Sequence, residues 1–228
     1  MVKKGADGVA IGPLSFSPSP SDNSPVALHN RYNFPPSIVT EPPETEQRPP
    51  FLEEEMTALL LRLHAHDERI LHALIVRRRR FPDLLMSGIT HLGDAATTIV
   101  LTLLLLLGTT PEIRSSGAYA AVALVSSHLG VQLLKRTINR ARPRLPIGYE
   151  SLIHAPDRFS FPSGHAAASM SVALGVVLFL PAALGALVMV LAVLVGVSRC
   201  YLGVHYPGDV LVGWILSFAG VLLALGLF

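Results

Sequence analysis

The sequence predicts an all-α integral membrane protein: a helical bundle of about five transmembrane helices, preceded by an amphipathic helix that lies in the membrane interface. The first observation is composition, since 50% of the 228 residues are hydrophobic and only 15% are charged. That balance is typical of membrane proteins rather than of soluble domains. The second is that long apolar stretches recur after residue 80, and the third is that basic and histidine side chains gather at their ends.

Residues 1–50 are predicted to form a disordered tail. This segment contains ten of the 18 prolines, and its apolar residues follow neither a helical nor an alternating period. Lys3 and Lys4 are followed by no apolar stretch of the length that a secretory signal needs. Membrane insertion is therefore expected to depend on the internal hydrophobic segments.

Residues 51–80 are predicted to form the amphipathic interfacial helix. Glu53, Glu54 and Glu55 fit a first helical turn, where acidic side chains favour the helix dipole, and leucines follow at helical spacing. Polar side chains interrupt the apolar pattern at Arg62, His66, Asp67, Glu68 and Arg69. Each ionised group would cost about 2.5–3.5 kcal/mol at the bilayer centre, so a helix along the membrane surface is favoured over a span.

The membrane domain is expected to cover residues 81–228. Five stretches have the length to cross the hydrocarbon core: about 84–107, 116–134, 164–181, 183–200 and 209–228. If the crossings alternate, the end of the second span, the start of the third, the end of the fourth and the start of the fifth lie on one face. The polar clusters occupy these ends, so they are expected to meet there.

Net charge and cysteine content limit the kinds of molecule that the protein is expected to bind. A formal net charge of +2 with dispersed basic residues does not favour nucleic acid, and membrane lipids are the expected partners. The single cysteine, Cys200, permits no intrachain disulfide and supplies no metal-binding cluster. The sequence leaves the oligomeric state open.

Three cationic side chains at the helix ends, Lys135, Arg142 and Arg199, are candidates for phosphate binding. Charge-assisted hydrogen bonds contribute roughly 1.5–3 kcal/mol apiece, so several converging donors favour an anion site. Taken one at a time, each of these side chains could instead simply extend its charged end to the membrane surface (snorkelling), without binding phosphate. Ser163 and Gly164 mark a helix start whose hydroxyl and backbone N–H groups are suited to face an anion, although Ser163 also fits the role of helix cap.

Two histidines and a carboxylate are candidates for the chemistry. His165 and His205 both titrate near neutral pH, so one imidazole is suited to attack phosphorus and the other to protonate the departing oxygen. Asp209 is the predicted orienting partner, because a carboxylate that holds one ring nitrogen protonated leaves the other as nucleophile. Without partners, each histidine would be better interpreted as structural.

Three motifs follow one another along the chain: Lys135-x6-Arg142-Pro143, Pro162-Ser163-Gly164-His165, and Ser198-Arg199-x5-His205-x3-Asp209. Their order and spacing resemble those of the type-2 phosphatidic acid phosphatase family of membrane lipid phosphatases, over roughly residues 60–228. The resemblance implies that His205 is the nucleophile and forms a phosphohistidine, that Asp209 supports it, and that His165 protonates the leaving group. It also implies metal-free catalysis without a cofactor, and phosphate binding by Lys135, Arg142, Ser163, Gly164 and Arg199.

Two other functions stay open at this point. The motifs are also similar to those of vanadate-dependent haloperoxidases, but these are soluble enzymes, so the membrane spans favour the phosphatase. A non-catalytic lipid-phosphate binding or transport protein would keep the pocket without the chemistry; the presence of His165, His205 and Asp209 weighs against it. Asp94 and His91 lie within a predicted span and are expected to face the bundle interior, where Asp94 is able to pair with a basic residue near the site, such as Lys135, or to make a structural hydrogen bond.

The substrate class follows from the position of the site. At helix ends, a phosphate enters the polar pocket while its acyl or prenyl chain stays in the lipid, and the resemblance gives undecaprenyl diphosphate, phosphatidic acid and phosphatidylglycerophosphate as candidates. The side of the cell membrane that the site faces stays open. Arg77–Arg80 favour a cytoplasmic site by the positive-inside rule, whereas the resemblance more often implies a site outside the cytoplasm.

Overall fold

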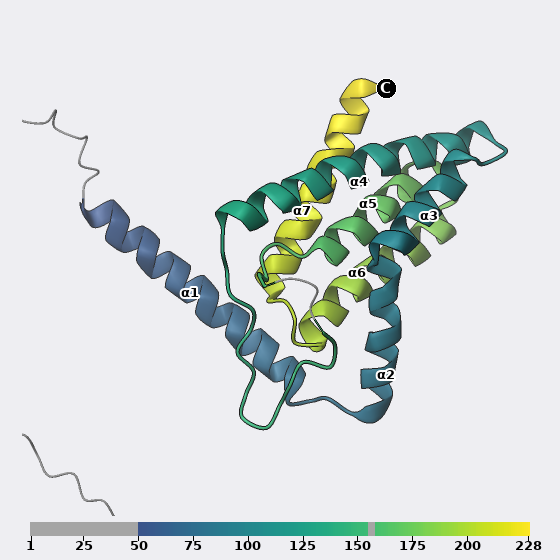
Figure 1. Cartoon of the computed structure of the whole chain (residues 1–228). Helices are drawn as coiled ribbons and strands as arrows, with labels where there is room; N and C mark the ends of the chain where they lie inside the picture. The colour runs from purple at the N-terminus through teal and green to yellow at the C-terminus, as the bar shows by residue number, and fades with distance from the viewer. Residues whose placement is uncertain (1–49, 155–157) are drawn as a thin grey trace, which may run out of the picture. The chain divides into compact units, whose positions relative to one another are not determined.

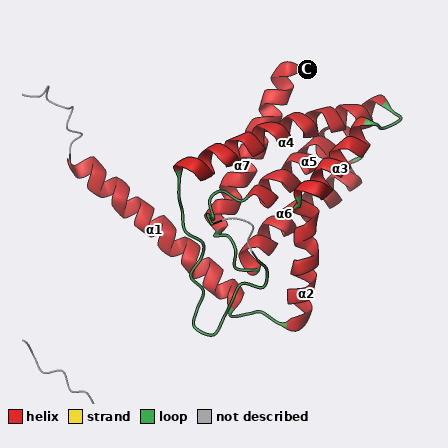
Figure 2. Ribbon diagram, viewed as in Figure 1, coloured by secondary structure: helices red, strands yellow, loops and turns green. Residues whose placement is uncertain are grey.

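The structure is a computed structural model that describes residues 50–154 and 158–228, and within these ranges it is helical without a strand (Figures 1 and 2). The elements are α1 (Pro50–Ile75), α2 (Arg80–Ile89), the 3-10 helix η1 (Thr90–Gly93), α3 (Ala95–Leu106), α4 (Pro111–Thr137), α5 (Gly164–Phe179), α6 (Ala182–Tyr201) and α7 (Pro207–Leu227). The predicted tail lies outside the described residues, apart from Pro50. The all-helical prediction is confirmed.

The protein is a multi-pass membrane protein. In the part of the chain that the structure describes, three helices, α4, α6 and α7, are long and apolar enough to cross a membrane, and α5 is a shorter apolar helix of 16 residues. The predicted span 84–107 is not one straight helix: Arg80–Gly93 and Ala95–Leu106 meet at an angle of 53°. Within residues 50–154 and 158–228, length and composition thus give three spans, or four if the bent pair counts as one, and the predicted number of five is not reached on this criterion.

The bend lies at Gly93 and Asp94. Asp94 has an extended conformation (φ −63°, ψ 147°) and is the N-cap residue of α3, so the helix is interrupted there. A side chain at Gly93 would collide with its surroundings, since a Cβ would lie 2.7 Å from Val195 Cγ1 and 2.9 Å from the His165 carbonyl oxygen. The close approach of η1 to α5 and α6 therefore requires glycine.

Helix α5 lies at the centre of the bundle and packs against α4, α6 and α7. Small residues allow these helices to approach closely, as is common in membranes. A Cβ at Gly175 of α5 would lie 2.6 Å from the Ser116 carbonyl oxygen of α4, and one at Gly213 of α7 would lie 2.6 Å from the Ser163 carbonyl oxygen. The hydroxyls of Ser127 and Ser171 hydrogen-bond between α4 and α5 at 3.0 Å. This packing fixes the start of α5 beside the start of α7.

The C-terminal half of α1 packs against the loops and helix ends of the bundle (Figure 1). Leu71 and Ile75 are fully buried in a cluster that includes Tyr206 and Val210. Other apolar side chains of α1, such as Leu63 and Ile70, are exposed. The helix ends at Ile75, before the predicted end at residue 80, and Arg80 already belongs to α2. That α1 also lies in the membrane interface stays a prediction.

Candidate active site

The three motif clusters meet where α4 ends, α5 begins, α6 ends and α7 begins. The Ser163 backbone N–H donates to the Asp209 carbonyl oxygen at 2.9 Å, which joins the second motif to the third. Arg142 Nη1 donates to the Val204 carbonyl oxygen at 2.6 Å, which joins the first motif to the third. The predicted meeting of the three clusters is therefore confirmed.

His205 lies in the connection between α6 and α7 and is almost fully buried. Its Nδ1 lies 2.5 Å from the Ser160 carbonyl oxygen. A carbonyl oxygen only accepts, so Nδ1 carries the proton and the lone pair of the neutral ring is on Nε2. Asp209 Oδ2 lies 3.7 Å from Nδ1, beyond hydrogen-bond distance. The Ser160 carbonyl oxygen, in the loop before α5, is thus the group at hydrogen-bond distance from Nδ1, and Asp209 lies further away and favours the charged ring. That Asp209 orients His205 stays a prediction.

Burial sets the protonation state of His205. Desolvation is the largest effect and lowers the pKa of His205 to about 4, with the positive charges of Arg199 and Arg142 acting in the same direction and Asp209 opposing them. The folded protein thus holds this ring neutral at physiological pH, which is the state that a nitrogen nucleophile needs.

Asp209 is completely buried in the first turn of α7 and receives two strong donors. Arg140 Nη1 lies 2.7 Å from Oδ1, and the Tyr206 backbone N–H donates to Oδ2 at 2.8 Å. Burial by itself lowers the pKa of Arg140. Hydrogen bonding to Asp67 and the charges of Asp209 and Asp67 outweigh this effect, so the pKa of Arg140 lies above its ordinary value. Arg140 thus compensates the buried carboxylate.

Sequence reasoning missed Arg140, which occupies a position inside the Lys135-x6-Arg142 spacing. In the sequence, Arg140 could have been noticed as a second basic residue two positions before Arg142. One of the carboxylates that it contacts, Asp67 of α1, lies 73 residues earlier in the chain, and no local sequence pattern connects the two residues.

His165 lies in the first turn of α5 and meets a carboxylate from the bend between η1 and α3. Its Nε2 lies 2.8 Å from Asp94 Oδ1, while Asp94 Oδ2 lies 2.8 Å from His91 Nδ1. The basic partner that was expected for Asp94 near the site is therefore His165, a predicted catalytic residue. A site predicted from three motifs thus receives a fourth contribution from the bent segment.

The side chains predicted to bind phosphate differ in how deeply they are buried in the protein. Arg199 is 2% exposed and donates from Nη1 to Thr90 Oγ1 at 2.8 Å, so η1 also holds this side chain. Lys135 is half-buried in the last turn of α4. Phosphate binding by Lys135, Arg142 and Arg199 stays a prediction.

The start of α5 was predicted to present the Ser163 hydroxyl and backbone N–H groups to an anion, and the structure agrees with this only in part. Ser163 is its N-cap, and its hydroxyl accepts from the Ala166 N–H at 3.5 Å. The Ser163 N–H does not face an incoming anion, because it is bonded to the Asp209 carbonyl oxygen. At Gly164 the surroundings are open, since the nearest atom to a Cβ added there would be Val131 Cγ1 at 3.9 Å. The helix start therefore offers the Ser163 hydroxyl and the N–H groups after it.

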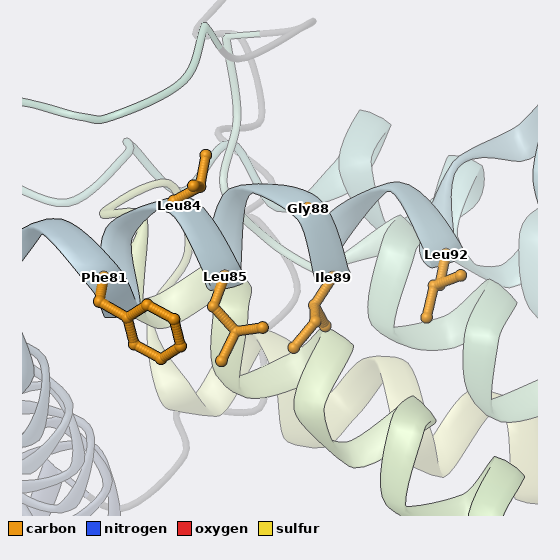
Figure 3. Close-up of a pocket in the computed structure, with 6 residues that line it drawn as sticks. All are labelled: Phe81, Leu84, Leu85, Gly88, Ile89 and Leu92. Carbon is orange, nitrogen blue, oxygen red and sulfur yellow. The ribbon is translucent and has the colours of Figure 1, made fainter.

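Two apolar pockets lie along α2, η1 and α3. The first has a volume of about 450 Å³ and is lined by Phe81, Leu84, Leu85, Gly88, Ile89 and Leu92; Figure 3 shows these side chains along α2 and η1. A second pocket, of about 240 Å³, shares Leu92 and reaches Ser169 and Val195, which lie one turn from His165 and Arg199. Nearly all of the lining is hydrocarbon.

A metal ion has no evident ligand set here. Among residues 50–154 and 158–228, no group of three or more His, Cys, Asp or Glu side chains is arranged to hold one. Metal-free catalysis stays a prediction that a chelator tests.

Known proteins resemble this chain over most of its length. Phosphatidylglycerophosphatase B of Bacillus subtilis is 34% identical over 164 residues, which cover 66% of this chain and 77% of that protein. Decaprenylphosphoryl-5-phosphoribose phosphatase of Mycobacterium tuberculosis is 34% identical over 128 residues, 55% of this chain and 69% of that protein. The crystal structure of a transmembrane PAP2 type phosphatidylglycerolphosphate phosphatase from Bacillus subtilis superposes with a TM-score of 0.61 at 30% identity, covering 78% of this chain and 92% of that one.

Fold, site and relatives together define the class: a multi-pass membrane enzyme that hydrolyses lipid phosphates. The model of the PAP2 superfamily matches residues 116–228, which hold all three motifs. The chain belongs to the PAP2 superfamily.

Proposed function

We propose that this enzyme removes phosphate from a lipid phosphate or diphosphate through a phosphohistidine formed on His205. The observation that carries the proposal is the hydrogen bond from His205 Nδ1 to the Ser160 carbonyl oxygen at 2.5 Å. Because this bond fixes the proton on Nδ1, Nε2 keeps its lone pair and is the ring nitrogen that attacks phosphorus. The burial of the ring keeps it neutral.

The first step forms a bond from Nε2 to phosphorus and breaks the bond from phosphorus to the leaving oxygen. His165 gives its proton to that oxygen, so the lipid alcohol, or the lipid monophosphate from a diphosphate, departs with its leaving oxygen protonated. In the second step His165 takes a proton from water, the water oxygen attacks phosphorus, and the bond between phosphorus and Nε2 breaks. Inorganic phosphate leaves, and both histidines return to their starting states.

The phosphate oxygens are bound by cations and by the start of α5. Lys135, Arg142 and Arg199 supply positive charge, and the Ser163 hydroxyl and the Gly164 N–H supply further donors at the positive end of the helix dipole. Charge that develops on the equatorial oxygens during attack is stabilised by donors that are already in position. No step requires a metal ion.

The lipid chain of the substrate lies in the apolar pockets beside α2, η1 and α3. The pocket that contains Leu92 and Val195 extends to within one helical turn of His165 and Arg199. A hydrocarbon chain there removes apolar surface from water while the head group stays in the polar site. Undecaprenyl diphosphate, phosphatidic acid and phosphatidylglycerophosphate are the substrates to compare.

The test is phosphate release by the purified protein from a panel of these three lipids, with EDTA present. We expect release by the wild type, loss of release in His205→Ala, and full release in His66→Ala, an exposed histidine of α1 that bonds to the Arg62 carbonyl oxygen of its own helix. Brief reaction with a ³²P-labelled substrate should leave an acid-labile, base-stable label on the wild type and none on His205→Ala. Release without such a label would contradict the phosphohistidine, and binding without release would favour a lipid-phosphate binding protein.

A further inference from the structure

Helix α1 supplies a carboxylate to the charged groups that surround Asp209. Asp67 Oδ2 lies 2.7 Å from Arg140 Nη2, and Asp67 Oδ1 accepts from the Gly208 backbone N–H at 2.8 Å. The other arm of the Arg140 guanidinium, Nη1, is bonded to Asp209. Asp67 therefore connects α1 both to the loop of the first motif and to the first turn of α7.

Arg140 is held between the two carboxylates and against an aromatic ring. Its guanidinium carbon lies 4.1 Å from the centre of the Tyr206 ring, and the same ring meets His64 in an edge-on arrangement at a centroid distance of 5.4 Å. Two of its nitrogens are used by different acids, each at 2.7 Å. A planar fork that is fixed in this manner has little freedom to rotate.

Anchoring of α1 does not by itself explain an aspartate at this position. Leu71 and Ile75 are fully buried one and two turns further along the same helix, and their apolar contacts already hold α1 against α6 and α7. The space at the start of α7 is also matched to the carboxylate, because a Cβ at Gly208 would lie 2.8 Å from Asp67 Oδ2. The location of this largely buried ion pair beside the catalytic segment points to a role in that segment.

We infer that Asp67 is a positioning residue for the reaction: it holds Arg140 against Asp209 and thereby fixes the segment from His205 to Asp209. The inference rests on the proposed function of His205. Asp67 lies outside residues 116–228, which the family model matches, so α1 adds to the site something that the three motifs do not contain. Without Asp67, Arg140 is able to turn toward water, and the fully buried Asp209 loses a charged partner.

The expected effect is on turnover rather than on substrate binding. Asp209 contacts the Tyr206 N–H, and the charge of Asp209 faces His205 together with those of Arg199 and Arg142. A displacement of this segment misaligns Nε2 with phosphorus, and misplacement by about 1 Å costs on the order of a hundredfold in rate. Two of the cations proposed to bind the phosphate oxygens, Lys135 on α4 and Arg199 on α6, lie outside this segment, so the KM is expected to change less than kcat.

The experiment compares Asp67→Asn with Leu71→Ala in the full-length protein. Asn keeps the shape and removes the ion pair, whereas Leu71→Ala weakens the anchoring of α1 without changing any charge. We expect Asp67→Asn to lower kcat about tenfold to a hundredfold at a KM within about twofold of the wild type, and Asp67→Glu to recover part of the loss. Leu71→Ala should lower the unfolding midpoint while kcat per folded enzyme is retained.

A second readout needs no turnover. Orthovanadate takes five ligands, as phosphorus does during attack, so its binding, measured by calorimetry, reports the alignment of the nucleophile. Weaker vanadate binding in Asp67→Asn than in Leu71→Ala is expected. If the wild type is active and Asp67→Asn has the kcat and the vanadate affinity of the wild type, the inference about Asp67 is overturned while the proposed function stands. The same conclusion follows if Asp67→Asn and Leu71→Ala both lose activity in proportion to their loss of stability. If the wild type neither turns over the lipid panel nor binds vanadate, the proposed function is overturned and the inference with it.

Discussion

The Nε2 atom of His165 lies 2.8 Å from Oδ1 of Asp94, although 71 residues separate them in the sequence. The contact exists because the chain bends between η1 and α3 and the Asp94 side chain is directed at the start of α5. Asp94 favours the protonated imidazole against burial and the charge of Arg199, which act in the opposite direction, and its bond to Nε2 leaves the Nδ1 proton as the one to be donated. Asp94 therefore has the geometry of a partner for the proposed general acid.

Asp94→Asn should lower kcat by roughly tenfold to a hundredfold, since general acid catalysis contributes about 10²–10⁴-fold and its partner governs part of that. The measurement is kcat per folded enzyme. The matched control is His91→Ala, which removes the other bond of Asp94 at an exposed side chain and should keep activity. Loss of stability with unchanged turnover in Asp94→Asn would reject the functional role and leave a structural hydrogen bond.

Gly93→Ala should displace the bend and reduce both stability and activity. The added Cβ would lie 2.7 Å from Val195 Cγ1 and 2.9 Å from the His165 carbonyl oxygen, so η1 must move away from α5 and α6. Overpacking of this kind costs about 1–3 kcal/mol. Gly226→Ala is the control, because a Cβ at this position of α7 meets nothing within 4 Å and should be tolerated. The readouts are the unfolding midpoint in detergent and phosphate release; equal behaviour of the two variants would contradict the packing argument.

Arg140→Ala should destabilise the protein strongly. Asp209 is fully buried, and removal of one partner of a buried ion pair typically costs about 3–5 kcal/mol because the other charge stays uncompensated. Arg136→Ala is the control, since Arg136 is an exposed arginine of the last turn of α4. Thermal unfolding in detergent gives the comparison, and a similar midpoint in both variants would show that Asp209 is compensated by other groups.

The stability of the protein should decline as the pH falls from 6.5 to 4. Burial lowers the pKa of His205 from 6.5 to about 4, so within this window the unfolded chain binds a proton that the folded protein does not. Stability therefore rises with pH there, and the contribution of His205 is fully present above pH 6.5. His205→Gln should show a flatter dependence of the unfolding midpoint on pH. Parallel curves for the wild type and the variant would indicate that His205 has its ordinary pKa in the folded protein.

Hydrophobicity and motif spacing predicted the membrane class and the polar residues of the candidate site. Hydrophobic length depends only on composition along the chain, so α4, α6 and α7 were predicted within a few residues of their bounds. Alternate crossing then placed the helix ends that carry Arg142, His165 and His205 on one face. The spacing of these residues was sufficient because each belongs to a local motif at a helix end.

Which side chains meet depends on the packing of separate elements in three dimensions. The bend at Asp94 lies inside an apolar stretch that satisfies the length of a span, and its cause is the packing of Gly93 against α5 and α6, which no hydropathy pattern contains. Likewise, the orientation of His205 by the Ser160 carbonyl oxygen and the placement of Arg140 between Asp67 and Asp209 join residues that are far apart in the chain. Such contacts depend on the three-dimensional approach of separate elements, whereas periodicity and spacing report only on neighbours along one element.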